Sequence, residues 1–242
     1  MEISTRTRVA TMHTQEESFS EMGLFQITDS AFPLGGFAFS YGLESMAKLG
    51  LIKDVSAFKK YLSNVLAQIS SSEMPFLNSA YIIAPEPYEA LIPIFEQIDA
   101  FITIPCLRKG SITQGRSLLQ IVKAVYLDQG FDQFIHWLRQ HDLPSHYAPV
   151  FGFVCRKIGF SHTEVLSAYV YIALRDQTSA AIRLGLLGPH EAQAILRETL
   201  RRVNGHIDRV KCLSYDQAFK VAVALEIAQA HHPNLYSHLF QN

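Results

Sequence analysis

The sequence predicts an all-α fold, a single-domain helical bundle of about ten helices. Apolar residues recur every three or four positions along most of the 242-residue chain, which is the period of an amphipathic helix. Convincing strands are nearly absent, because the short apolar runs at 81–85 and 101–105 stand alone. No internal repeat or low-complexity linker divides the chain, so one helical domain is the simplest interpretation.

The helical period is clearest between residues 55 and 69. The apolar positions there are Val55, Phe58, Leu62, Val65 and Ile69. They step by three and four, and Asp54 or Ser56 is placed to cap the helix. The same pattern returns from Tyr147 to Ile158, where Gly159 is suited to end the helix.

The longest predicted helix begins after Ser161. Ser161 and Glu164 have the spacing of a capping box, and the following run is apolar nearly all round. A helix of this kind is normally buried, so we expect it at the centre of the bundle. Gly188 and Pro189 predict the start of a further helix, which residues 204–205 (Asn-Gly) are expected to close. Residues 214–232 predict a last helix.

The composition excludes some classes of partner. Hydrophobic residues make up 48% and charged residues 18%, and the formal net charge is −1. Such a chain has no overall electrostatic attraction to nucleic acid or to an anionic membrane, and the basic positions between residues 197 and 211 are interpreted as a solvated helix face. Because charge is scarce, apolar surface is left over for a partner, and we expect a homodimer.

The three cysteines favour a reducing compartment. Cys106, Cys155 and Cys212 lie far apart and form no CxxC pair, which argues against a disulfide framework or a cysteine-rich zinc site. Residues 1–22 lack the apolar core of a secretory signal and are predicted to be a flexible tail. No apolar run reaches the roughly 18 residues of a membrane-spanning helix. We therefore expect a cytoplasmic protein.

Residues 110–117, GSITQGRS, come close to a phosphate-binding loop. That loop needs a lysine before its final serine or threonine, and here Arg116 holds the position. It also needs a preceding strand and a parallel sheet, which the chain does not predict. The preferred interpretation is a helix with Gly115 near its start, and a helical NTPase using Gly110–Ser117 is kept as a less favoured alternative.

No catalytic or metal-binding pattern stands out among the ten histidines. None forms HExxH, and His231 and His232 would point about 100° apart on a helix. His141 and His146 flank a proline turn and could meet. Cys155 is interpreted as a core thiol, and no GxSxG elbow is present. We predict no enzyme activity, no metal site and no cofactor.

Two segments stand out as docking surfaces. Residues 30–45, SAFPLGGFAFSYGLES, combine glycines, aromatics and a single charge, Glu44. Residues 234–242 follow Pro233, which cannot continue the preceding helix, and carry Leu235, Tyr236, Leu239 and Phe240. We expect this tail to form a short amphipathic helix on a partner and to lie outside the core. The alternative is that it folds back onto its own domain.

The first of these segments, extended to residues 24–45, resembles the signature of the UreF family of urease accessory proteins. The matching positions are Asp29, Pro33, Gly35, Gly36, Ser40, Gly42, Leu43 and Glu44. Residues 107–119 and 146–160 resemble two further family blocks, and the tail resembles the family's Leu-Tyr-Ser-x-Leu-Phe ending. The chain departs from the pattern after Arg183, where a proline and a glutamine are lost, and at His238, where the family often has arginine.

The resemblance implies an all-helical homodimer without enzyme activity. It would bind UreD, also called UreH, recruit the GTPase UreG, and pass nickel transiently to apo-urease. A further possibility is that it stimulates GTP hydrolysis by UreG through Arg116 or Arg183. The candidate partner-binding residues are Asp29, Pro33, Gly35, Gly36, Ser40, Tyr41, Gly42, Glu44, Arg116, Arg183, Leu235, Tyr236, His238, Leu239 and Phe240.

Overall fold

The computed structural model describes residues 22–36, 39–83, 87–127 and 130–240. The chain divides into two compact units, residues 1–32 and residues 33–242. In the first unit, residues 22–28 are helical, and the carboxylate of Asp29 accepts a hydrogen bond from the backbone N–H of Ala31 at 2.6 Å. The flexible tail predicted for residues 1–22 lies outside the described residues, apart from Met22.

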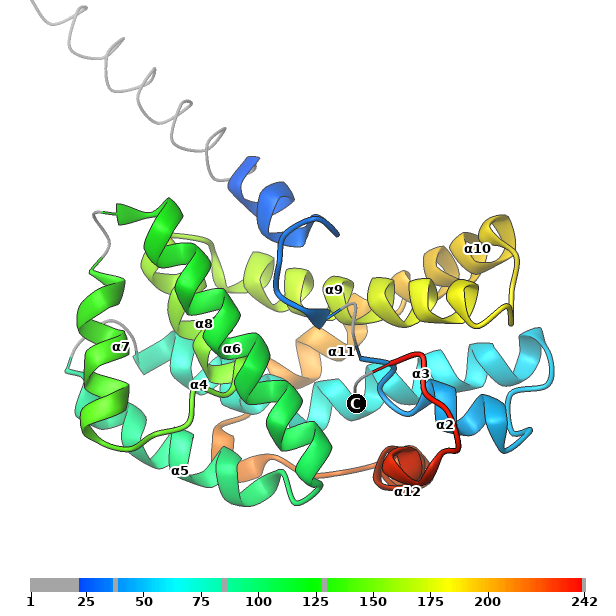
Figure 1. Cartoon of the computed structure of the whole chain (residues 1–242). Coiled ribbons are helices and arrows are strands. Elements are labelled where there is room, and N and C mark those ends of the chain that lie inside the picture. Colours follow the sequence, from blue (N-terminus) through cyan, green and yellow to red (C-terminus); the bar gives the residue numbers. More distant parts are fainter. Residues whose placement is uncertain (1–21, 37–38, 84–86, 128–129, 241–242) are drawn as a thin grey trace, which may run out of the picture. The chain divides into compact units, whose positions relative to one another are not determined.

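The second unit is built from helices, as predicted (Figure 1). Its eleven α-helices are α2 (Leu43–Lys48), α3 (Val55–Ser72), α4 (Met74–Ile83), α5 (Ile92–Phe101), α6 (Pro105–Val125), α7 (Phe131–Gln140), α8 (Tyr147–Ile158), α9 (His162–Arg183), α10 (Pro189–Leu200), α11 (Val203–Val210) and α12 (Val223–His231). Three 3-10 turns accompany these helices in the described part of the unit: Tyr88–Leu91, Tyr215–Gln217 and His232–Asn234. Within the described ranges no strand occurs, which confirms the all-α class.

The predicted helix ends are confirmed where the signals were local. The Asp54 carboxylate accepts a hydrogen bond from the backbone N–H of Ala57 at 2.8 Å and so caps α3. Gly159 ends α8 with φ of 106°, a conformation that glycine adopts without strain. Ser161 and Glu164 form the expected capping box at the start of α9. These three ends follow directly from the residues that form them.

Two predicted helix boundaries are wrong. Helix α10 ends at Leu200, and residues 204–205 lie inside α11 instead of closing α10. The weak helix propensity of Asn and Gly is outweighed there, because α11 buries Val203, Ile207 and Val210.

The helix predicted over 214–232 is reduced to a 3-10 turn, an extended stretch and α12. The Gln68 side-chain oxygen accepts hydrogen bonds from the backbone N–H groups of Val221 and Ala222, at 2.9 and 2.8 Å. The backbone N–H of Phe219 bonds to the Ser71 carbonyl at 2.9 Å. Groups from α3 thus satisfy the backbone donors that a continuous helix would have used.

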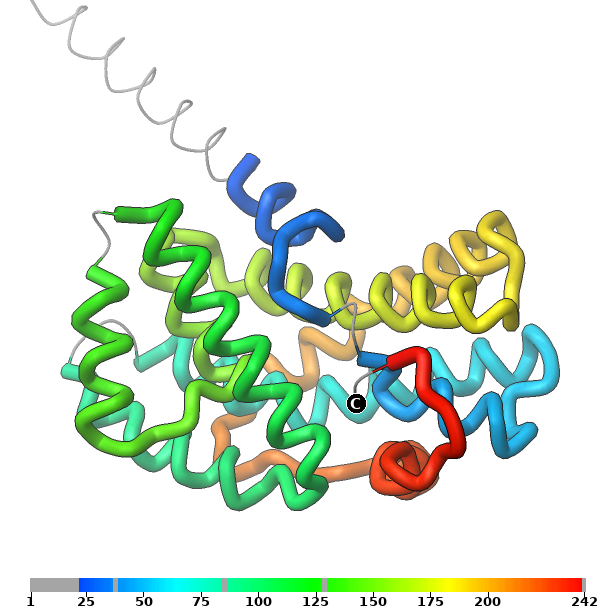
Figure 2. The backbone as a smooth tube through the Cα atoms, in the orientation of Figure 1, coloured from blue at the N-terminus to red at the C-terminus, as the bar shows by residue number. Residues whose placement is uncertain are grey.

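The core forms around α8 and α9. Helix α8 packs against α4 and α6, and α9 packs against α3, α10 and α11. Gly152 brings α8 so close to α4 that a Cβ would lie 2.2 Å from the Leu77 carbonyl oxygen. Twelve of the residues of α9 are buried, which confirms its predicted central position. The C-terminal segment, red in Figure 2, returns to lie beside the start of α2.

Candidate functional site

The described part of the 30–45 segment in the second unit turns the chain into α2 through unusual backbone angles. Gly35, Tyr41 and Gly42 have φ values of 80°, 50° and 86°. At Gly42 a Cβ would also lie 3.0 Å from the Gln229 side chain on α12. Gly36 serves a different purpose, because a Cβ there would lie 2.5 Å from a carboxylate oxygen of Asp176 on α9. The close approaches at Gly42 and at Gly36 together place α2 between α12 and α9.

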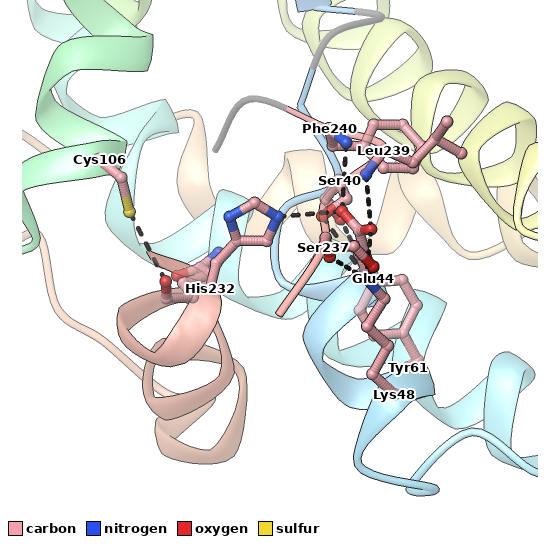
Figure 3. Close-up of polar contacts among 10 residues, drawn as sticks. Ser40, Glu44, Lys48, Tyr61, Cys106, His232, Ser237, Leu239 and Phe240 are labelled. Carbon is pink, nitrogen blue, oxygen red and sulfur yellow. Dashed lines mark hydrogen bonds and ion pairs between the residues drawn. The ribbon is translucent and has the colours of Figure 1, made fainter. Parts of the chain in front are cut away.

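Glu44, the one charge of that segment, holds the C-terminal tail. Its side chain is buried, with 1% exposed, and its two oxygens accept hydrogen bonds from the backbone N–H groups of Leu239 at 2.7 Å and Phe240 at 3.2 Å. His232 Nε2 lies 3.0 Å from the second oxygen, and Lys48 Nζ lies 3.2 Å from the first (Figure 3). We call these five residues the Glu44 clasp.

Further contacts fix the tail on either side of the clasp. Lys48 donates hydrogen bonds to the backbone carbonyl and the hydroxyl of Ser237. The rings of His232 and His238 stack with centroids 5.2 Å apart, and the Arg183 guanidinium lies 4.2 Å from the centre of the Phe240 ring. Helices α2 and α9 and the 3-10 turn His232–Asn234 therefore all contact residues 237–240.

The environment of Glu44 favours its ionised form. Burial raises the pKa of Glu44, but the hydrogen bonds from Leu239, His232 and Lys48 outweigh burial and hold the pKa below its usual value. A carboxylate with a lowered folded-state pKa stabilises the fold above its unfolded pKa and loses that contribution as the pH falls. The clasp therefore contributes its full stabilisation at neutral pH, and that contribution decreases in acid as Glu44 becomes protonated.

The expectation that the tail lies outside the core is wrong for Phe240. The Phe240 side chain is buried against Arg183, and the segment forms bends in the free chain. The reason is that Glu44 accepts the N–H groups of residues 239 and 240 and draws the chain inward. The short helix expected on docking to a partner stays a prediction. Tyr236 and Leu239 remain exposed, with 59% of Leu239 accessible, so the tail presents these two side chains outward.

The other predicted partner-binding residues lie in different parts of the fold. Ser40 is buried beside Glu44, and its Oγ accepts a hydrogen bond from the Glu44 N–H at 3.4 Å. Pro33 is exposed, and Leu235 is half-buried at the start of the tail. Asp29 belongs to the first unit. Arg116 is exposed on α6 and is not a member of the clasp.

The helical-NTPase alternative is wrong, because residues 110–117 form no loop. They lie in the middle of α6, where the backbone N–H groups are used within the helix and cannot surround a phosphate. Helix α6 begins at Pro105, so Gly115 is interior and not near a helix start. Its small size is needed because a Cβ would lie 1.9 Å from the Ser145 carbonyl oxygen.

A partly buried cluster of Asp99, Ser111 and His146 was not expected from the sequence. His146 Nε2 lies 2.9 Å from Asp99, its Nδ1 lies 3.1 Å from the Ser111 hydroxyl, and Arg108 binds the same carboxylate at 2.6 Å. The order of groups is that of a Ser-His-Asp triad, but Ser111 lies inside α6, where no backbone N–H is left to stabilise an oxyanion. The cluster joins α5, α6 and α8.

Ser111 is itself fully engaged, since its hydroxyl accepts the Tyr147 N–H at 3.1 Å. His141 contacts the Trp137 carbonyl, whereas His146 binds Asp99, so the two histidines have separate partners. In the part of the chain that the structure describes, no three His, Cys, Asp or Glu side chains are grouped to hold a metal ion. Cys155 is a buried core thiol, as predicted, and burial raises its pKa.

We expect His146 to make stability depend on pH below about 6.5. Burial lowers the pKa of His146, although Asp99 acts in the opposite direction. The unfolded chain then binds a proton that the folded chain does not, so the free energy of unfolding falls as the pH decreases, by up to about 1.4 kcal/mol per pH unit. Urea unfolding between pH 5 and 8 should show this slope in the wild type and a smaller slope in His146→Gln.

Burial also lowers the pKa of His162 and His206, which contribute in the same direction. The decisive quantity is therefore the difference in slope between the two proteins. An identical pH dependence in His146→Gln would show that His146 titrates alike in the folded and unfolded chains.

Comparisons with known proteins identify the family. A model of the UreF family matches residues 52–200. The chain is 30% identical over 222 residues to urease accessory protein F of Oryza sativa subsp. japonica, covering 89% of this chain and 83% of the rice protein. It is 28% identical over 229 residues to the Arabidopsis thaliana protein F, covering 94% and 95%. It is 30% identical over 230 residues to UreF of Arthrobacter sp. (strain FB24), covering 92% and 97%.

These relatives match about nine-tenths of the chain, whereas the family model matches residues 52–200, from the start of α3 to the end of α10. None of the described helices is long and apolar enough to span a membrane. The helical fold and the turn that precedes Glu44 at the start of α2 agree with the family match. Because that match extends over most of the chain, the chain belongs to the UreF family of urease accessory proteins.

Proposed function

We propose that this protein is a non-enzymatic scaffold for nickel insertion into apo-urease. It acts in the cytoplasm as a homodimer, binds UreD (UreH), and through that complex recruits the GTPase UreG. Nickel passes through the assembly without a permanent site on this chain. Family membership supports the role in urease maturation, and the tail held by the Glu44 clasp supports the mode of partner binding.

The observation that carries the proposal is the ordered tail. Five contacts to α2, α9 and the 3-10 turn after α12 hold residues 237–240 in place, while Tyr236 and Leu239 are exposed. An apolar side chain buried against a partner contributes on the order of 1.5–3 kcal/mol before ordering costs. Because the tail is already ordered, less conformational entropy is lost when it docks.

The surface offers further apolar groups for assembly. Val223 and Ile227 lie one turn apart on α12, and both side chains are more than 60% exposed. Arg183 is engaged by Phe240, so an activating role for this arginine toward UreG would first require the tail to leave. The scaffold role requires no such rearrangement, and the geometry therefore favours it.

Binding of UreD tests the proposal. The double variant Tyr236→Ala, Leu239→Ala removes the two exposed side chains and leaves the clasp intact, and we expect it to weaken UreD binding by at least tenfold with no change in thermal midpoint. Ile82→Ala removes an exposed apolar side chain from α4 and serves as the matched control. Binding is measured by calorimetry or surface plasmon resonance. Equal affinity in the double variant and the wild type would disprove docking through the tail.

A further inference from the structure

A cavity of about 140 Å³ lies inside the second unit, and the turn that leads into α2 forms part of its wall. On this measure a single water needs about 10–15 Å³, so the space takes a small organic molecule. Its apolar walls come from α3, α5, α6 and α9, and include Val65, Ile69, Ile98, Leu107 and Ile172. Thr103, an exposed residue between α5 and α6, also lines it, so the cavity reaches the surface there.

The polar end of the cavity is Glu73, at the junction of α3 and α4. Its Oε1 accepts a hydrogen bond from the Tyr41 hydroxyl, and its Oε2 accepts one from the Tyr169 hydroxyl at 2.5 Å. Tyr41 is one of two described non-glycine residues with positive φ, so the chain adopts a costly backbone angle where this hydroxyl is placed. The two tyrosine hydroxyls favour the ionised form of the Glu73 carboxyl and lower its pKa, whereas burial raises it.

Glu73 is the carboxylate of this cavity that lacks a cation. The other two acidic residues in its lining are paired, Asp176 with Arg175 at 2.7 Å and Glu226 with Lys220 at 3.0 Å. Among the described residues, none forms an ion pair with Glu73. Burial raises the pKa of Glu73, which is the cost of keeping this charge away from water. A cation that entered the cavity would remove that cost.

A second polar group faces the same lining. Tyr147 belongs to the cavity wall and is more than nine-tenths buried, and its hydroxyl has no hydrogen-bond partner among the described residues. An unpartnered buried hydroxyl is uncommon, and a ligand is one way to satisfy it. The cavity thus combines one carboxylate without a cation, one wall residue whose hydroxyl is unpartnered among the described residues, and apolar walls.

We propose that this cavity binds an organic cation, an ammonium or guanidinium group on a short apolar stem, with the charged group on Glu73. The apolar walls fit the stem, and the carboxylate fits a group that donates hydrogen bonds. A transition-metal ion fits less well, because no three metal-ligating side chains converge among the described residues. The proposal does not depend on the scaffold role, and either can fail without the other.

Pentylamine and 1-pentanol test the charge requirement, because they share the apolar stem and differ in the cation. Titration calorimetry on the full chain should show pentylamine binding at least tenfold tighter than pentanol. Glu73→Gln should abolish that preference, whereas Glu198→Gln, which changes an exposed carboxylate of α10, should preserve it. Circular dichroism checks that both variants are folded.

A second variant reduces the volume of the cavity and leaves its charge unchanged. Ala173 also lines the cavity, so Ala173→Leu should exclude pentylamine while leaving the carboxylate unchanged. N-acetyl-arginine amide distinguishes the two sources of the cation, because it carries the guanidinium group as a protein side chain does. If both probes bind, a side chain of a partner protein can enter the cavity. If only pentylamine binds, the ligand is a free small molecule. Equal binding of pentylamine and pentanol, unchanged binding in Glu73→Gln, or binding of nickel chloride without the amine would overturn the proposal.

Discussion

Replacing Glu44 with alanine should lower the free energy of unfolding by about 3 kcal/mol, because it removes a buried charge and leaves its partners unsatisfied. The N–H groups of Leu239 and Phe240 and the ring of His232 would lose their acceptor inside the domain. For a chain of this length that loss corresponds to roughly 6–12 °C in the thermal midpoint. The tail would also detach, so UreD binding should fall together with stability.

Differential scanning calorimetry measures the first effect, and amide hydrogen exchange at residues 239 and 240 measures the second. Glu44→Gln keeps one carbonyl oxygen as an acceptor but loses the ion pair with Lys48, so its destabilisation should be about half as large. Unchanged exchange protection at residues 239 and 240 in Glu44→Ala would show that other contacts hold the tail.

Gly115→Ala should destabilise the protein by about 2–3 kcal/mol, although alanine is the better helix former. The added Cβ would lie 1.9 Å from the Ser145 carbonyl oxygen, which belongs to the link before α8. Because the contact is with backbone, no side chain can rotate away, and α6 must separate from that link. The usual gain of up to about 1 kcal/mol from replacing a helical glycine is smaller than this cost.

Gly205→Ala is the matched control, since Gly205 also lies inside a helix but a Cβ there would meet nothing within 4 Å. We expect this variant to gain about 0.4–1 kcal/mol in stability. Urea unfolding of both variants gives the comparison directly. Similar changes in the two proteins would mean that close packing at Gly115 does not matter.

Local sequence signals were enough to predict several elements of this fold. The Asp54 cap, the Ser161–Glu164 box and the end of α8 at Gly159 each depend on residues within one turn of one another. Periodicity predicted α3, α8 and the buried α9 for the same reason. The resemblance to UreF could also be recognised from the sequence, because glycine, proline and aromatic spacing is a property of the chain itself.

Contacts between residues far apart in the sequence determined how those elements pack. Glu44 and the backbone of Leu239 are 195 positions apart, and Gln68 and the backbone of Val221 are 153 positions apart, so neither contact leaves a pattern in a local window. The same holds for the Asp99–His146 pair and for Tyr169 on Glu73, separated by 47 and 96 positions. The sequence by itself determined the all-α class, most of the helices and the family to which the chain belongs. Only the folded chain could decide that Phe240 is buried, because a buried carboxylate stabilises whichever hydrogen-bond donors the fold brings to it.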